Sequence, residues 1–100
     1  MIAPILAASV RLVAAPYKDN YGFARASAVI EIKGDEIGAK VILQVRLSAP
    51  VYGACGRHLL ACGEGDLLLV SGKLQAEWAY CANNTRVPVM QFDVERLAPL

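Results

Sequence analysis

The stretch LLLVSGKLQAEWAY, residues 67–80, alternates apolar and polar side chains over most of its length. In an extended chain, one face would carry Leu68, Val70, Gly72, Leu74 and Ala76, and the other Ser71, Lys73, Gln75 and Glu77. Such alternation is typical of a β-strand with one buried face. A glycine inside a strand marks a bend or a close backbone approach, as at the corner of a barrel. The stretch therefore predicts a strand of a curved sheet. It also raises the question of which side Trp78, the only tryptophan, occupies.

Four more segments show the same period of two, at residues 6–12, 24–33, 40–48 and 90–95. Each has an apolar face and a polar face. One-sided burial is usual in antiparallel sheets, so we expect five antiparallel strands. The glycine-containing loops between them are expected at residues 15–22 and 34–38, with a further loop at 81–86.

One segment breaks the alternation. APVYGACGRHLLACG, residues 49–63, has apolar residues at a helical spacing, with Pro50 at a first-turn position. Gly53 and Gly56 weaken such a helix, but they would allow it to pack close against a strand. GEGD, residues 63–66, then ends the helix and turns into the next strand. We expect one short helix between the third and fourth strands.

This order of elements predicts an all-β domain, a five-stranded OB-fold barrel spanning residues 1–100 as a single domain. A composition of 56% hydrophobic and 19% charged residues excludes a disordered chain. No apolar run reaches the ~18 residues needed to cross a bilayer, so we expect no membrane partner. The start, MIAPILAASVRLVAA, resembles a signal peptide but lacks a basic beginning, and we interpret it as the first strand.

The reactive residue types are sparse. Cys55, Cys62 and Cys81 form no CxxC motif, and the single His58 leaves too few ligands for a zinc site. We expect small core-facing thiols in a reduced, cytoplasmic protein. No nucleophile and base stand at a suggestive spacing, and no phosphate-binding loop is present. We therefore expect no catalytic residues, metal or cofactor, and no enzyme activity.

The net charge is only +1, yet the outward strand faces are expected to be basic. They carry Arg11, Arg25, Lys33, Lys40, Arg46 and Lys73 against Glu31 and Glu77. The other acidic residues, Asp19 and Asp93 among them, are assigned to loops or to the last strand, away from this face. Such a face suits a phosphate backbone, and Ser27, Gln44, Ser71 and Gln75 add neutral hydrogen-bonding groups. The alternative is that these charges merely cover the wet side of a barrel.

Three of the seven aromatic residues cluster in YKDNYGF, residues 17–23. Lys18 lies between Tyr17 and Tyr21, and Arg25 follows Phe23. Proteins that bind single strands need flat side chains on which bases stack, each worth roughly 1–3 kcal/mol. The loop therefore indicates a stacking site, with the alternative that Phe23 closes the end of the barrel.

The stretch GDLLLVSGKLQAEW, residues 65–78, resembles the bacterial single-stranded DNA-binding proteins, whose corresponding strand reads apolar-x-Gly-x-Leu and leads to a tryptophan. RLVAAPYKDNYGFARASAVIEI, residues 11–32, is similar to the family's first two strands, and KVILQVRLS, residues 40–48, to its third. The resemblance implies an OB fold, usually assembled as a homotetramer, that binds single-stranded DNA without sequence preference and has no catalytic residues.

The chain departs from the family pattern in three respects. The family tryptophan lies one residue further along and faces the DNA, whereas Trp78 is in phase with Leu74 and Ala76. Its phase predicts burial, unless a bulge shifts the register. Leu47 stands where the family carries a stacking phenylalanine. The sequence ends at ERLAPL, without the family's acidic, partner-recruiting tail. Because the first two departures weaken the family's stacking platform, we expect stacking to rely on residues 17–23 and on Tyr80.

Our leading hypothesis is sequence-independent binding and protection of single-stranded DNA in replication, repair or recombination. The expected partners are single-stranded DNA, further copies of this chain as a homotetramer, and replication or repair proteins, with a cytoplasmic, nucleoid-associated location. The alternative is a protein–protein interaction module, as in primosome-type relatives, with weak or no DNA binding. The candidate DNA-binding residues are Arg11, Tyr17, Lys18, Tyr21, Phe23, Arg25, Ser27, Gln44, Arg46, Lys73, Gln75, Trp78, Tyr80 and Arg86.

Overall fold

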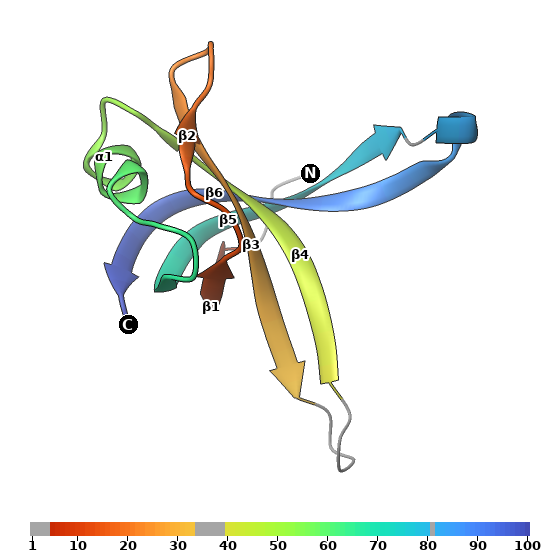
Figure 1. Cartoon of the computed structure of the whole chain (residues 1–100), viewed down its shortest axis with the longest axis horizontal. Helices are drawn as coiled ribbons and strands as arrows, with labels where there is room; N and C mark the ends of the chain where they lie inside the picture. The colour runs from red at the N-terminus through yellow and green to blue at the C-terminus, as the bar shows by residue number, and fades with distance from the viewer. Residues whose placement is uncertain (1–4, 34–39, 81) are drawn as a thin grey trace.

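The computed structural model describes residues 5–33, 40–80 and 82–100. Strands dominate it, as the alternation predicts, and a single α-helix lies between β4 and β5 (Figure 1). The elements in chain order are β1 (Ile5–Leu12), β2 (Tyr17–Lys18), β3 (Phe23–Lys33), β4 (Lys40–Pro50), α1 (Ala54–Leu60), β5 (Leu67–Tyr80), the 3₁₀ turn η1 (Ala82–Asn84) and β6 (Arg86–Pro99). The predicted 34–38 loop and Cys81 lie outside the described residues.

Five of the strands close into a barrel, which confirms the OB fold. The sheet order is β1-β5-β6-β4-β3-β2, and β1 also pairs with β3 through Arg11 with Val29 and Leu12 with Ala28, which closes the ring. The expectation of wholly antiparallel pairing is wrong at one place, because β4 and β6 run parallel. The chain reverses direction twice between them, at β5 and again at β6, so the two strands point the same way.

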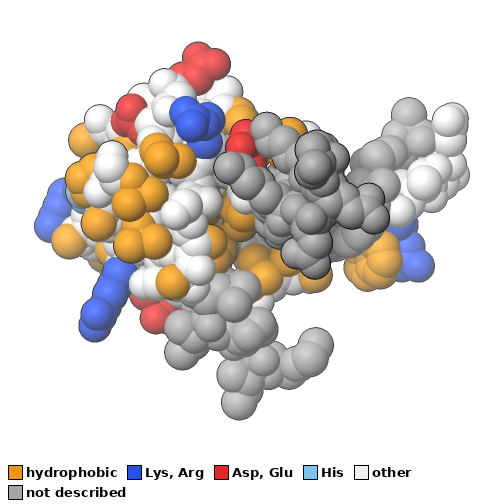
Figure 2. Space-filling model, turned by 90° about the horizontal axis from the view of Figure 1, so that it is seen from below, with side chains coloured by type: hydrophobic (Ala, Val, Ile, Leu, Met, Phe, Trp, Pro, Cys, Tyr) orange, Lys and Arg blue, Asp and Glu red, His pale blue; other side chains and the backbone are white. Residues whose placement is uncertain are grey.

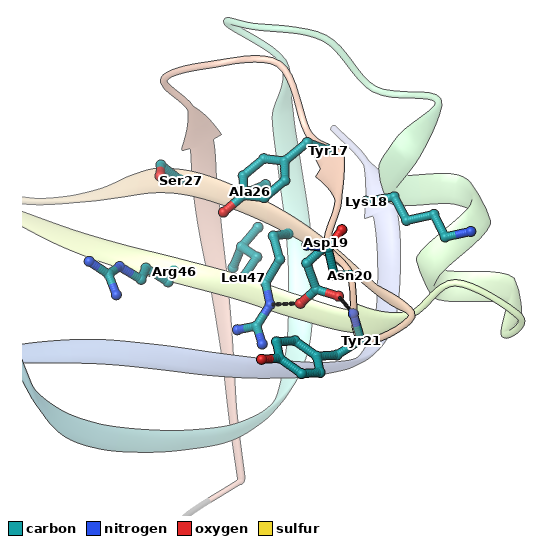
Figure 3. A pocket seen from close by; sticks show the side chains of 10 residues that line it. Tyr17, Lys18, Asp19, Asn20, Tyr21, Ala26, Ser27, Arg46 and Leu47 are labelled. Carbon is teal, nitrogen blue, oxygen red and sulfur yellow. Dashed lines mark hydrogen bonds and ion pairs between the residues drawn. The ribbon is translucent and has the colours of Figure 1, made fainter.

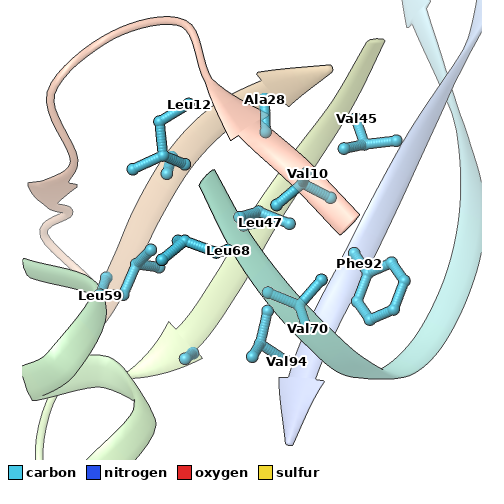
Figure 4. Packing of buried hydrophobic residues seen from close by; sticks show 13 residues of the cluster. Val10, Leu12, Ala28, Val45, Leu47, Leu59, Leu68, Val70, Phe92 and Val94 are labelled. Atoms are coloured by element: carbon cyan, nitrogen blue, oxygen red, sulfur yellow. The ribbon is translucent and has the colours of Figure 1, made fainter. Parts of the chain in front are cut away.

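The apolar faces of the barrel strands meet in one core (Figure 4). Phe92 is its largest fully buried side chain. The other buried hydrophobic residues are Val10, Leu12, Ala24, Ala26, Ala28, Val45, Leu47, Ala49, Leu59, Leu68, Val70 and Val94. Small alanines along β3 leave room for larger side chains from the strands opposite, as close packing requires. Cys55 and Cys62 are only half-buried at the margin of this core.

Helix α1 packs on β3, β4 and β6 and contributes Leu59 to the core. The close approach expected from its glycines is present, since a Cβ on Gly56 would lie 1.9 Å from the carbonyl oxygen of Pro50. The expected start of the helix is wrong. Pro50 ends β4, and the Gly53 N–H donates to its carbonyl at 3.1 Å, so the chain turns there and the helix begins at Ala54.

Gly72 lies at a close approach between the backbones of β5 and β6. The register between the strands shifts between Ser71 and Gly72, so that Gly72 pairs with Val94 while Ser71 pairs with Arg96. Glu95 is the extra residue of a bulge in β6. A Cβ on Gly72 would lie 2.0 Å from the carbonyl oxygen of Asp93, a distance that no side chain tolerates. Bulges bend strands, and this one curves the sheet at a barrel corner, as predicted.

Both long hairpins run past the barrel (Figure 1). β5 and β6 have 14 residues each, and β3 and β4 have 11. Leu43 shares the face of the buried Val45 and Leu47, but it lies beyond the core and is exposed. We call the ends of the hairpins the β3–β4 arm (residues 31–33 and 40–43) and the β5–β6 arm (residues 77–80 and 86–89). None of the side chains that the structure describes in these arms belongs to the buried core.

We predict that Gly72→Ala destabilises the barrel by about 1–3 kcal/mol, because the added methyl group must displace the β6 backbone. The measurement is urea unfolding followed by circular dichroism. Gly63→Ala is the matched control, since nothing lies within 4 Å of a Cβ at that position. Equal stability of the two variants would contradict the close approach.

Candidate nucleic-acid interface

The loop between β2 and β3 is organised around the carboxylate of Asp19. Its Oδ1 accepts the backbone N–H groups of Tyr21 at 2.8 Å and Phe23 at 2.9 Å. The Asp19 N–H in turn donates to the Phe23 carbonyl at 2.9 Å. Gly22 takes φ +84°, a left-handed conformation that glycine adopts without strain. This is the side-chain-to-backbone turn that aspartate favours, and it holds the backbone of the loop at Tyr21 and Phe23.

Beside this loop lies a pocket of about 670 Å³ (Figure 3). Its lining includes six predicted site residues, Tyr17, Lys18, Tyr21, Arg25, Ser27 and Arg46, together with Asp19, Asn20, Ala26 and Leu47. Tyr17 is 58% exposed and Tyr21 is 85% exposed, so neither ring is part of the core. The structure therefore brings the aromatic loop and the basic strands to one place. We call this hollow the tyrosine pocket.

A second hollow of about 360 Å³ continues along β3 and β4 toward β6. It shares Ser27 and Arg46 with the tyrosine pocket and adds Gln44. Its other lining residues are Val13, Ala28, Val29, Val45 and Val89. Ser27 and Arg46 are direct cross-strand partners, and Gln44 is the partner of Val29. The two hollows therefore form one outward groove, which we call the β3–β4 groove.

The outward face is less basic than expected, because two aspartates placed elsewhere by the sequence lie in it. Arg25 Nε donates to Asp19 Oδ2 at 2.8 Å, an ion pair within the tyrosine pocket. Asp93 lies on β6 between its cross-strand partners Lys73 and Ser48. The separation of acidic loops from a basic face was therefore wrong. Asp19 lies there because its loop folds back and the carboxylate pairs with Arg25 of β3. Asp93 lies there because β6 pairs with β5 on one side and, in parallel, with β4 on the other.

Lys73, Gln75 and Arg11 are among the predicted residues that do not line the groove. Lys73 is exposed on β5, beside Asp93. The Nε2 of Gln75 donates a hydrogen bond to the Asp93 carboxylate, so its amide is already engaged by the protein. Arg11 is exposed on β1 opposite Val29 of the groove but lines neither hollow, and its Nη1 lies 3.4 Å from the carbonyl oxygen of Gly65. The side chains of Lys33 and Lys40 lie outside the described part of the structure.

Trp78 is 61% exposed, so the predicted burial is wrong. Its phase is unchanged, because the extra residue of the bulge lies in β6 and not in β5. Trp78 therefore occupies the same face as the buried Leu68 and Val70, but on the β5–β6 arm, beyond the core. The guanidinium carbon of Arg86 lies 4.7 Å from the centre of its ring, a cation–π contact. The indole is an exposed platform away from the β3–β4 groove.

Phe23 and Tyr80 complete the predicted set. Phe23 is half-buried and does not line the tyrosine pocket, although the Arg25 guanidinium carbon lies 5.6 Å from its ring centre. The backbone of Tyr80 ends β5 opposite Arg86. The side chain of Tyr80 lies outside the described part of the structure.

Sequence reasoning missed Asp19 and Asn20 as pocket residues and Val13 and Val89 as walls of the groove. Asp19 had a local signal, since DNYG is a turn sequence in which aspartate accepts backbone N–H groups. Val89 had none, because its place beside β4 depends on the parallel pairing of β4 with β6. In the described ranges, no cluster of three or more His, Cys, Asp or Glu side chains could hold a metal ion. No helix in those ranges is long and apolar enough to span a membrane.

No protein-family model matches the sequence, and no curated protein sequence matches it either. Among solved structures, the fold is similar to the crystal structure of the small single-stranded DNA-binding protein from Streptomyces coelicolor. The TM-score is 0.77, and the alignment covers 100% of this chain and 96% of that one. The chain shares that protein's fold. The sequences are 12% identical, so the resemblance establishes the architecture, and what this chain binds has to be argued from its own residues.

Asp19 supplies a prediction about pH. The hydrogen bond from the Phe23 N–H, with those from Arg25 and Tyr21, holds the pKa of Asp19 below its ordinary value. A carboxyl group whose pKa is depressed by folding stabilises the fold above its unfolded pKa, and that contribution is lost as the pH falls through the folded pKa. Asp19→Asn should therefore lower the Tm at about pH 7, and the difference from the wild type should shrink toward about pH 2.

The control for this measurement is Glu64→Gln, on the exposed turn before β5. Its Tm should follow that of the wild type over the same pH range. A difference for Asp19→Asn that stays constant with pH would show that the carboxylate charge does not stabilise the loop.

Proposed function

We propose that this protein binds single-stranded DNA without enzymatic activity, through the β3–β4 groove. The observation that carries the proposal is the tyrosine pocket, where two exposed aromatic rings stand beside Arg46 on the outer face of an OB barrel. Bases stack on aromatic faces regardless of sequence, and cationic side chains contact the backbone between them. The strand lies along the groove, with bases against Tyr17 and Tyr21 and the backbone crossing Arg46.

The finer parts of the proposal follow from the sequence resemblance. Binding is independent of sequence and protects DNA in replication, repair or recombination. The protein works in the cytoplasm, associated with the nucleoid, and replication or repair proteins are its further partners. The exposed pair of Trp78 and Arg86 on the β5–β6 arm offers a second stacking surface to a strand that runs beyond the groove.

The test is titration with oligo(dT) at low salt, followed by gel shift and by the fluorescence of Trp78. We expect binding that weakens with added salt, because phosphate contacts release counterions. Arg46→Ala should weaken binding and reduce the slope of log K against log salt by about 0.7, the value for one contact on a single strand. Quenching of Trp78 would show that the strand reaches the β5–β6 arm.

Arg96→Ala is the matched control, because Arg96 is an exposed arginine beyond the bulge of β6 and lines neither hollow of the groove. It should bind oligo(dT) like the wild type. Absence of binding by the wild type at tens of micromolar protein would remove the proposal. The alternative, a protein–protein interaction module of the primosome type, would then be favoured by the acidic residues in the outward face.

We also propose self-association as a homotetramer. β1 pairs with β3 only at Arg11 and Leu12, so over Ile5–Val10 that edge has no partner among the described strands. An unpaired strand edge is a template for pairing with another copy. On the neighbouring face of β5, Leu67 and Leu69 are 40% and 43% exposed. Leu69 lies between Ser9 of β1 and Ala98 of β6. Hydrophobic side chains gather over the barrel in the view of Figure 2.

We predict that light scattering gives about four times the mass of one chain, and that Leu69→Lys lowers it by placing a charge in the contact. Ile42→Lys is the control, since Ile42 is an exposed aliphatic residue on the β3–β4 arm and should leave the mass unchanged. A wild-type monomer at working concentration would contradict this assembly.

A further inference from the structure

The two arginines of the tyrosine pocket differ in their electrostatic surroundings. Arg25 is bound by Asp19 at 2.8 Å, and the side chains are 29% and 14% exposed, respectively. The pair therefore presents almost no net charge to a ligand. Arg46 is exposed, faces Ser27 across the β3–β4 ladder, and has no ion pair within the described part of the chain.

The Asp19 carboxylate is fixed in place and in charge. Both of its oxygens are engaged, Oδ1 by the N–H groups of Tyr21 and Phe23 and Oδ2 by Arg25. Those hydrogen bonds favour the ionised form and lower the pKa, so the group stays negative at neutral pH. A phosphate bound beside it would be repelled by a carboxylate whose position is fixed by its hydrogen bonds. Lys18 also lines this end of the groove, but its side chain points away from the tyrosine rings and from the Asp19–Arg25 pair (Figure 3). Asp19 thus disfavours an anion beside Tyr17 and Tyr21.

Building on the proposed function, we propose that the groove is divided into two subsites and that Asp19 sets the division. The end lined by Tyr17, Tyr21 and the Asp19–Arg25 pair accepts a nucleobase and excludes phosphate. The end at Ser27 and Arg46 accepts the phosphate. Asp19 is then a specificity-determining residue, and Arg25 serves as a neutralised, flat surface beside the tyrosine rings.

This division has a physical basis in how each group gains from contact. A base is uncharged and gains from stacking on rings and on a guanidinium plane, which a nearby carboxylate does not oppose. A phosphate gains from an unneutralised cation and from hydroxyl donors. Arg46 and Ser27 supply both, and they lie at the overlap of the two hollows, where the backbone must pass.

The experiment measures the salt dependence of oligo(dT) binding for four variants, each first checked for folding by thermal melting. Arg46→Gln should flatten the slope by about 0.7. Arg25→Gln should leave the slope unchanged, because Arg25 contacts no phosphate. Asp19→Asn should steepen it by about 0.7, because the freed Arg25 can then engage one. The asparagine Oδ1 can still accept the two backbone N–H groups, so the loop is retained.

The double variant Asp19→Asn/Arg25→Gln replaces the ion pair by a neutral pair of similar shape and should show the wild-type slope. If the slope of log K against log salt falls by about 0.7 in both the double variant and Arg25→Gln, Arg25 is a phosphate contact and the proposal is overturned. An unchanged slope for Asp19→Asn would also overturn the proposal, because the freed Arg25 would then make no contact with a phosphate.

An abasic strand of equal length provides the second readout. The wild type should bind it at least about tenfold more weakly than oligo(dT), since the base subsite is left empty. Asp19→Asn should bind the abasic strand more tightly than the wild type does. Equal affinity of the wild type for both strands would contradict a base subsite. Failure of the proposed function is distinct from these results, because the wild type would then bind neither strand at low salt.

Discussion

The barrel depends on one close backbone contact, where β5 passes β6 at Gly72. The carbonyl of Asp93 approaches the α-carbon there so closely that only a hydrogen fits, and the bulge at Glu95 bends β6 around it. β6 pairs with β5 along one edge and with β4 along the other. Asp93, whose carbonyl makes the close contact, lies between the buried Phe92 and Val94, so its side chain points to the outward face. The same residue therefore contributes to the fit of β5 against β6 and to the charge of the outward face.

Much of the fold could be predicted from the sequence, because one-sided alternation identifies strands and Gly72 marks the corner. Other parts of the fold were missed. β6 extends from Arg86 to Pro99, beyond the predicted 90–95, although Pro88 and Pro99 lack the N–H that strands use. Pro88 lies on the β5–β6 arm opposite Trp78, where a missing hydrogen bond is tolerated at an edge. The two-residue β2 is too short to produce any period.

Trp78 shows where alternation stops being informative. Phase tells which face of a strand a side chain occupies, and for Trp78 that prediction was right. Burial depends in addition on whether another layer covers the face at that point along the strand. β5 extends beyond the end of the barrel. Leu74 is therefore half-buried and Trp78 is exposed, although both lie on the same face of the strand as Val70. How far a strand extends beyond the barrel depends on the tertiary structure, and a local stretch of sequence does not determine it.

The candidate site was predicted in its residue types but not in its charge balance. Tyr17, Tyr21, Ser27 and Arg46 were placed together correctly, because they follow from a loop and two alternating strands. Asp19 forms an ion pair with Arg25, a contact between residues six apart that counting charges along strands does not capture. In the proposed site, Arg46 and Lys18 have no ion pair among the described residues, whereas Arg25 is compensated by Asp19 beside two exposed tyrosines. A single strand in this site would gain less from long-range attraction than from stacking. Affinity in this protein should therefore depend on aromatic surface more than on net charge, which agrees with a chain whose formal charge is only +1.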